Sequence, residues 1–211
     1  MKQQPFEKQP SPSDFWDQRY ATESYAYGTE PNSFFEEKLA QLKAGKILLP
    51  GEGEGRNAVY AAQRGWEVHA FDQSEQGQKK ALKLAGDRGV HLDYQIHDYQ
   101  NYSPGAEKFD CIGLFYTHMP APLRNHFFGQ LHHWLNQGGQ LLLEGFAKAQ
   151  ILNTSGGPKR EDMLFSEEEL KQDFKNFAVL EIISHTVLLQ EGNFHQGQAN
   201  IIRAVAQKKI K

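Results

Sequence analysis

The stretch KILLPGEGEGRNAVYAA, residues 46–62, decides the fold of this chain. It starts with a short apolar run, continues through three glycines at alternate positions and ends in a segment that suits a helix. A strand, a glycine-rich turn and a helix in this order are typical of an open α/β sheet, which binds ligands beyond the carboxyl ends of its strands. Because glycine has no Cβ atom, its backbone can approach such a ligand closely. The stretch therefore predicts an α/β domain with a ligand site at this turn.

The same alternation of strand and helix continues downstream. Apolar or alternating segments predict five strands, at residues 46–50, 66–72, 90–98, 110–116 and 140–146. Segments with helical spacing lie between and after them, at residues 56–64, 74–87, 120–135 and 166–177. Strands that alternate with helices predict a parallel sheet built from right-handed crossover units.

The end of the chain departs from this pattern. Residues 179–190 and 198–206 are both strand-like, and the segment EGNFHQG between them is too short for a crossover helix. Two strands joined so closely pair as an antiparallel hairpin. The sheet is therefore predicted to end in a hairpin rather than in a further parallel strand.

The composition excludes several classes of function. The 211 residues carry a net charge of -3, so there is no overall basic field that would favour a nucleic-acid or anionic-membrane partner. The single cysteine, Cys111, excludes an internal disulfide framework, and its apolar strand predicts an inert core thiol. The chain also lacks the apolar runs of a transmembrane helix and of a signal peptide, so we expect a cytoplasmic protein.

The chain is expected to form one domain. Residues 1–13 contain three prolines and few apolar side chains, which predicts a flexible tail. Residues 14–211 then form a single domain. Within it, residues 14–42 are rich in aromatic side chains and predict two short helices that serve as a lid.

Acidic residues near the glycine turn indicate the class of cofactor. Asp72 ends the second strand, 19 residues after Gly53, where an acid typically binds the hydroxyls of an adenosyl ribose. Residues 53–58 also fit the dinucleotide fingerprint, so an NAD-dependent oxidoreductase is one alternative. Glu52 and Glu54, however, would repel a diphosphate and suit the net positive S-adenosylmethionine. We therefore expect S-adenosylmethionine as cofactor, with a non-catalytic cofactor-binding protein as a second alternative.

In their order and spacing, several motifs resemble those of the class I S-adenosylmethionine-dependent methyltransferases. The likeness is greatest to small bacterial members related to the tellurite-resistance and thiopurine methyltransferase groups. It implies a Rossmann-like three-layer α/β/α sandwich with a seven-stranded, mostly parallel sheet of order 3-2-1-4-5-7-6, in which strand 7 is antiparallel. The motifs are KILLPGEGEGRNAVYAA (46–62), HAFDQS (69–74), HDY (97–99), FDCIGLFYTHMP (109–120) and WLNQGGQLLLEGF (134–146), preceded by the lid-like FWDQRY (15–20) and YAYGTEPNSFF (25–35).

The resemblance also implies roles for individual residues. Asp72 would bind the ribose hydroxyls, and Tyr27 is the first candidate among the lid aromatics to face the sulfonium. Leu49 stands where many relatives carry an acid, so Glu52 either holds the ammonium group or is a solvated turn residue. The other expected cofactor contacts are Gly51, Gly53, Gly55 and Asn57 on the methionine side, Gln73, Asp98 and Tyr99 on the adenine side, and Phe115 beside the methyl group.

The expected reaction is in-line methyl transfer to a small-molecule nucleophile. A thiol-like acceptor needs no general base, whereas a hydroxyl or amine would need one, and His118 beyond the fourth strand is a candidate if it is not an ordinary loop histidine. Arg124 either binds an acidic substrate or, as we expect, forms a surface ion pair. His195 is expected to be a turn or surface residue of the hairpin, although that turn can reach the edge of the active site. No histidine spacing predicts a metal site.

Overall fold

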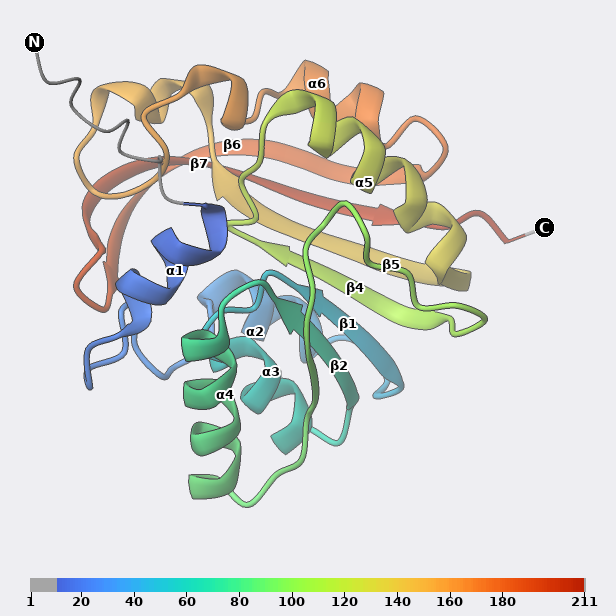
Figure 1. The fold of residues 1–211 in the computed structure, drawn as a ribbon. Coiled ribbons are helices and arrows are strands. Elements are labelled where there is room, and N and C mark those ends of the chain that lie inside the picture. The colour runs from blue at the N-terminus through green and yellow to red at the C-terminus, as the bar shows by residue number, and fades with distance from the viewer. Residues whose placement is uncertain (1–10, 211) are drawn as a thin grey trace, which may run out of the picture.

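The computed structural model describes residues 11–210, which form a seven-stranded sheet with helices on both faces (Figure 1). The strand order is β3-β2-β1-β4-β5-β7-β6, and β7 runs antiparallel to its two neighbours while the other pairs are parallel. The predicted fold class is therefore confirmed, including the order and the antiparallel strand. The strands are β1 (Lys46–Pro50), β2 (Glu67–Asp72), β3 (Asp93–Ile96), β4 (Phe109–Phe115), β5 (Leu135–Phe146), β6 (Ala178–Glu191) and β7 (His195–Gln207).

The helices bury apolar side chains against the two faces of the sheet. One core contains side chains of α2, α3 and α4, and the other contains side chains of α5 and α6. Among residues 11–210, none of the helices has both the length and the apolar character of a membrane span. The helices are α1 (Pro12–Tyr20), α2 (Ser33–Leu39), α3 (Arg56–Gln63), α4 (Glu75–Asp87), α5 (Ala121–Trp134) and α6 (Glu167–Asp173), with short 3-10 helices η1 (Lys148–Leu152) and η2 (Glu161–Met163).

The turn between β1 and α3 requires its glycines. Gly51, Gly53 and Gly55 have φ angles of 64°, 61° and 88°, a backbone region that strains any residue with a Cβ atom. A Cβ atom on Gly55 would also lie 2.6 Å from the Cβ atom of Ala81 in α4. The alternate glycines therefore set the path of the turn and the close packing of α3 against α4.

The β6–β7 hairpin extends beyond the carboxyl edge of the sheet. Phe146, the last residue of β5, pairs with Ile201, whereas β7 already begins at His195. The tip of the hairpin therefore projects past the strands that bind the ligand in such a fold. There it meets the segment between α1 and α2, because the Asn193 amide donates to the Ala26 carbonyl over 2.9 Å. We call α1, α2 and the segment between them the lid.

The structure differs from the sequence expectations at several element ends. The third strand covers residues 93–96 instead of 90–98, because its partner β2 ends at Asp72, which pairs with Ile96. Beyond Ile96, the His97 amide still donates to the Asp72 carbonyl over 3.0 Å, but β2 offers no further residue to pair with the strand-like alternation. Of the expected tail, residues 1–10 lie outside the described part of the chain, whereas Pro12 and Ser13 already belong to α1, which Ser11 caps. The lid therefore begins two residues earlier than predicted.

The contact between the hairpin and the lid makes Gly192→Ala strongly destabilising. Gly192 has a φ angle of 57°, and a Cβ atom there would lie 2.3 Å from the Ala26 carbonyl oxygen. Gly89→Ala is the matched control, because Gly89 has a φ angle of 67° but nothing within 4 Å of the added atom. We expect Gly89→Ala to lower the free energy of unfolding by about 1–2 kcal/mol through backbone strain, and Gly192→Ala to lower it by roughly 1–3 kcal/mol more. Urea denaturation measures both, and equal losses would contradict the packing argument.

Candidate active site

The structure brings the glycine turn and Asp72 together at the carboxyl edge of the sheet. The Asp72 carboxylate accepts hydrogen bonds from the Gly53 amide (3.1 Å) and the Ser74 amide (2.9 Å), and the residue is only 7% exposed. The Tyr94 hydroxyl donates to the Gly53 carbonyl over 2.6 Å. The end of β2 therefore holds the turn in place, as the sequence spacing predicts.

Two carboxylates, Glu52 in the turn and Asp72 at the end of β2, are buried at this edge of the sheet. Oε1 of Glu52 accepts from the Ala58 amide over 2.7 Å, and burial raises the pKa of Glu52 to about 7. Burial also raises the pKa of Asp72 to about 6, although three backbone amides oppose the shift. Neither side chain forms an ion pair within residues 11–210. Poorly solvated carboxylates of this kind suit a ligand that carries positive charge and hydroxyl donors.

A buried hydroxyl next to the same turn supports a polar ligand. Oγ1 of Thr117 is buried without a hydrogen-bond partner among the described residues. Thr117 adjoins the turn, because a Cβ atom on Gly51 would lie 3.3 Å from its Cγ2 atom. Unsatisfied buried polar atoms are rare in folded proteins. The Thr117 hydroxyl and the Glu52 and Asp72 carboxylates therefore fit S-adenosylmethionine, which carries an ammonium group, a carboxylate and ribose hydroxyls.

Glu54 has a different role from the one expected. Lys80 Nζ lies 2.5 Å from its Oε1 atom, and its Oε2 atom accepts from the Ala26 amide over 2.7 Å. The side chain is therefore neutralised and binds the lid to α4. Of the two acidic residues in the turn, Glu52 can therefore favour a cationic ligand, whereas Glu54 cannot.

Asn57 is likewise engaged with the lid. Its Oδ1 atom accepts from the Asn32 amide over 2.9 Å, directly before α2. Gln73 follows Asp72 and is half-buried, whereas Asp98 is exposed and caps a turn by accepting from the Asn101 amide over 2.8 Å. Asp98 therefore lies at the expected adenine end, with its carboxylate at the surface.

Aromatic side chains enclose the turn. The Tyr99 hydroxyl lies where a Cβ atom on Gly51 would stand, and the Tyr20 hydroxyl would lie 2.6 Å from a Cβ atom on Gly53. Phe115 is buried at the end of β4, with its ring 5.0 Å from that of Phe35. Tyr20 is thus the lid aromatic that covers the glycines. Tyr27 lies farther along the lid, where its ring is 4.5 Å from that of His195.

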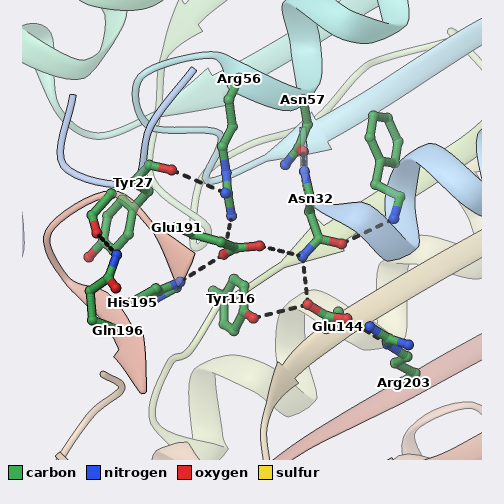
Figure 2. A network of polar contacts seen from close by, with 12 residues as sticks. Tyr27, Asn32, Arg56, Asn57, Tyr116, Glu144, Glu191, His195, Gln196 and Arg203 are labelled. Atoms are coloured by element: carbon green, nitrogen blue, oxygen red, sulfur yellow. Dashed lines mark hydrogen bonds and ion pairs between the residues drawn. The ribbon is translucent and has the colours of Figure 1, made fainter. Parts of the chain in front are cut away.

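A polar network joins the lid to the far half of the sheet (Figure 2). Its centre is Glu144 in β5, which is 1% exposed. This carboxylate lies 2.6 Å from Arg203 Nε and accepts hydrogen bonds from Asn32 Nδ2 (2.6 Å) and the Tyr116 hydroxyl (3.0 Å). Glu144 therefore binds the lid, the end of β4 and β7 at once.

Glu191 forms the second branch of the network. Its Oε2 atom lies 3.0 Å from Arg56 Nη2 and 3.1 Å from His195 Nδ1 (Figure 2). Arg56 also donates to the Tyr27 carbonyl over 3.2 Å. This network could not be predicted from the sequence, because its members come from segments of the chain that meet only in the folded protein. Its one sequence signal is the acidic Glu144 within the apolar run LLLEGF.

Tyr116 occupies the point where β4 leaves the sheet. It has a φ angle of 55° and is the one non-glycine residue with positive φ in the described chain. Its amide donates to the Glu144 carbonyl over 2.8 Å, and its hydroxyl donates to the Glu144 carboxylate. These two hydrogen bonds hold Tyr116 in the left-handed conformation. Such conformations concentrate at functional sites, which agrees with the position of Tyr116 beside the expected methyl-donor residue Phe115.

His118 does not have a free nitrogen. Its Nε2 atom accepts from the Phe146 amide over 3.0 Å, and its Nδ1 atom lies 2.8 Å from the Met163 carbonyl and so donates to it. Burial lowers the pKa of His118 to about 4. The ring is therefore a neutral structural bridge, and the candidate role as general base is not supported.

Two other expectations of surface exposure are wrong. Arg124 is buried, with Nε 3.0 Å from an Asp173 carboxylate oxygen, because α5 and α6 pack across it. His195 is only 4% exposed, because the lid and the ends of β4 and β5 surround the hairpin tip. Cys111 is buried, and burial raises the pKa of its thiol, as expected for an inert core residue.

A cavity of about 390 Å³ lies between the lid and the β6–β7 hairpin. Its walls include aliphatic side chains of β6 and both ion pairs of the polar network. Representative lining residues are Tyr27, Arg56, Glu144, Leu188, Glu191 and Arg203. The volume falls in the range of sites for small molecules.

Comparison with known proteins shows which proteins this chain resembles. Residues 47–139 match the family model described as a methyltransferase domain. The chain is also 26% identical, over 160 residues, to the 2-heptyl-1-hydroxyquinolin-4(1H)-one methyltransferase of Mycobacteroides abscessus, an alignment that covers 74% of this chain and 68% of the relative. Residues 47–139 are therefore a methyltransferase domain. The expected resemblance is thereby confirmed.

Solved structures share the fold of this methyltransferase. TehB from Haemophilus influenzae superimposes with a TM-score of 0.71 at 18% identity, covering 93% of this chain and 67% of that chain. The N-methyltransferase NodS from Bradyrhizobium japonicum WM9, in complex with S-adenosyl-L-homocysteine, gives a TM-score of 0.68 at 16% identity, covering 93% and 97%. The topology described above is therefore that of established methyltransferases.

Glu52→Gln tests whether the turn carries an uncompensated carboxylate. In the folded protein the pKa of Glu52 is about 7, above its ordinary value of 4.5. Between pH 4.5 and pH 7 the folded protein therefore keeps a proton on Glu52 that the unfolded chain has lost. The free energy of unfolding therefore falls as pH rises from 4.5 to 7. We expect the glutamine variant, which keeps an oxygen for the Ala58 amide, to be about 2–3 kcal/mol more stable at pH 8 and unchanged at pH 4.

Urea denaturation across this pH range measures the effect. Glu161→Gln is the matched control for the loss of one carboxylate, since Glu161 is an exposed acid in η2. A Glu52→Gln stability that follows the wild type at every pH would show that Glu52 titrates as an ordinary surface acid.

Proposed function

We propose that this methyltransferase transfers the methyl group of S-adenosylmethionine in line to a small-molecule nucleophile, and that the carboxyl edge of β1, β2 and β4 holds the cofactor. The observation that carries the cofactor site is the pair of buried carboxylates, Glu52 and Asp72, beside the positive-φ glycines. Among the described residues neither forms an ion pair, because Arg56, the cation nearest to Glu52, is paired with Glu191. A cationic ligand with vicinal hydroxyls satisfies both. A dinucleotide would instead place a diphosphate beside Glu52.

Each part of the cofactor has matching residues in this proposal. Asp72 accepts from the ribose hydroxyls, and Glu52 faces the ammonium group. Gln73, Asp98 and Tyr99 adjoin the adenine. Gly51, Gly53 and Gly55 line the methionine portion, and Phe115 and Tyr27 lie toward the methyl group. Asn57 is left out of the cofactor contacts, because its side-chain carbonyl already binds the lid.

The protein mainly orients the reactants and excludes water. S-adenosylmethionine supplies an electrophilic methyl group that its positive sulfur already activates. Tyr20 covers the glycine turn, and the ion pair of Glu54 with Lys80 binds the lid above it. Arg56 holds the Tyr27 carbonyl from the other side. A lid fixed at several points keeps the acceptor aligned and the site dry, which is where such an enzyme gains most of its rate.

The cavity between the lid and the hairpin supports a small-molecule acceptor. Its volume of about 390 Å³ accommodates a compact molecule. The net charge of -3 offers no field for nucleic acid. The Mycobacteroides abscessus relative is named for a hydroxylated quinolinone. A small aromatic hydroxyl compound is therefore the first acceptor class to test.

Titration calorimetry tests the cofactor assignment. We expect S-adenosylmethionine and S-adenosylhomocysteine to bind and NAD not to bind. Loss of the carboxylate acceptor in Asp72→Asn should weaken S-adenosylmethionine binding by about 10- to 100-fold, the effect of hydrogen bonds to a charged group. Asp93→Asn is the control, since Asp93 is an exposed acid at the amino end of β3, the opposite end of the sheet.

Further outcomes separate the alternatives. If Asp72→Asn does not fold, Glu52→Gln provides the test, because it removes the negative charge and keeps the hydrogen bond to α3. Tight NAD binding without binding of either adenosylsulfur ligand would overturn the proposal in favour of an oxidoreductase. Transfer of a labelled methyl group to a panel of phenols and thiols distinguishes the enzyme from a non-catalytic binding protein.

A further inference from the structure

His195 lies among aromatic rings from three other parts of the fold. Its ring centre is 4.5 Å from that of Tyr27 in the lid, 4.3 Å from that of Tyr116 after β4 and 5.2 Å from that of Phe146 at the end of β5. These elements surround the space beyond the carboxyl ends of β4 and β5. A methyl acceptor must enter this region to reach a methyl group held beside Phe115.

The two nitrogens of His195 have different surroundings. Nδ1 lies 3.1 Å from the Glu191 carboxylate, which can only accept, so Nδ1 carries the proton in the neutral ring. Nε2 has no hydrogen-bond partner among residues 11–210. Its lone pair is therefore free, whereas the corresponding nitrogen of His118 is bonded to the Phe146 amide. Of these two histidines at the carboxyl edge, only His195 can accept a proton.

Glu191 is itself held in place. Arg56 Nη2 lies 3.0 Å from the oxygen that faces His195, and Asn32 Nδ2 donates to the other oxygen over 3.4 Å. Arg56 opens α3 directly after the glycine turn, and Asn32 caps α2 in the lid. Figure 2 shows the chain of contacts from Arg56 through Glu191 to His195. The orientation of the imidazole thus depends on the cofactor turn and on the lid together.

We propose that His195 is the general base that accepts the proton of a hydroxyl group on the methyl acceptor, and that Glu191 is the positioning residue that fixes its tautomer. This inference rests on the proposed function and adds to it both the base and the acceptor class. Glu191 and Tyr27, which both contact the imidazole, also line the small-molecule cavity, so the imidazole lies directly behind its wall. A histidine oriented by a carboxylate is a recurrent arrangement for proton removal.

The proposed step converts an acceptor R–OH into its methyl ether. The hydroxyl proton moves to Nε2 of His195, and the oxygen lone pair forms the new bond to the methyl carbon. The carbon–sulfur bond breaks with its electron pair left on sulfur, which gives the methyl ether R–OCH₃ and S-adenosylhomocysteine. The imidazolium, stabilised by the Glu191 carboxylate, then releases its proton to solvent.

Burial of His195 favours the neutral imidazole between turnovers. Burial lowers the pKa of His195 below its ordinary value, and Arg56 lowers it too, whereas Glu191 and Glu144 oppose the shift. The base is therefore unprotonated at neutral pH. The titratable and charged groups that face it are Glu191 of β6, Glu144 of β5, Arg56 of α3, Tyr27 of the lid, and Tyr116 and His118 after β4.

His195→Gln tests the base by comparing two acceptors. Phenol needs a base at neutral pH, whereas benzenethiol ionises readily and needs none. We expect the variant to methylate phenol about 10²- to 10⁴-fold more slowly than the wild type, the usual contribution of general base catalysis, and to lose much less activity on benzenethiol. The wild-type rate with phenol should level off above the pKa of His195, while the variant rate should keep rising with pH.

His185→Gln is the matched control. His185 lies on β6 of the same hairpin, pairs with Ile201 and lies outside the proposed site. Equal losses on phenol and benzenethiol would assign His195 a structural role and overturn the inference while leaving methyl transfer in place. If wild-type protein binds S-adenosylmethionine but methylates neither probe, the proposed transfer to small nucleophiles fails instead.

The tautomer provides a test that does not depend on turnover. Long-range proton–nitrogen NMR spectra of the full chain, assigned by the signal that His195→Gln removes, should show a neutral ring with the proton on Nδ1. Glu191→Gln should weaken this preference and lower the phenol rate more than the benzenethiol rate. A proton on Nε2 in the wild type would make that nitrogen a donor and overturn the inference, whatever the acceptor.

Discussion

The buried carboxylate of Glu144 is the constraint on which the arrangement of the active site depends. It lies buried near the carboxyl end of β5, where an unpaired charge would cost several kcal/mol. The chain satisfies it by bringing together the Arg203 side chain from β7, the Tyr116 hydroxyl from the end of β4 and the Asn32 amide from the lid. The hydrogen bond from Asn32 to this buried carboxylate thus helps to fix the position of the lid over the sheet.

The remaining polar residues divide into two groups according to whether the protein already satisfies them. Glu54 and Asn57 stand beside the cofactor turn in the sequence, yet each is bonded to the lid. Glu52 and Asp72 are held only by backbone amides and lack a cation. The same distinction separates the two histidines, since His118 uses both nitrogens and His195 keeps one free. Unfilled hydrogen-bonding capacity therefore marks the places where ligands are expected.

Sequence patterns predicted most of the fold because backbone conformation and helix capping depend on residues that are close in the sequence. The glycines at alternate positions match three positive φ angles, and Ser74 and Ser166 cap helices where the sequence indicates helix starts. The short loop 191–197 correctly predicted a hairpin. Errors arose where a neighbour decides the outcome: the third strand stops at Ile96 because β2 offers no further partner. Arg124 and His195 were expected at the surface because their burial depends on helices and strands far away in the sequence.

By itself, the sequence determined the order of the elements, the glycine turn and the acid at the end of β2, and hence the methyltransferase fold and its class of cofactor. These features depend on backbone conformation and on hydrophobic spacing over a few residues. Only the tertiary structure decided that Glu191 and His195 pair at the hairpin tip, that Arg56 reaches them from α3, and that Glu144 gathers the lid above them. The reason is physical: charge pairing and desolvation act between side chains that approach one another only after the sheet has assembled.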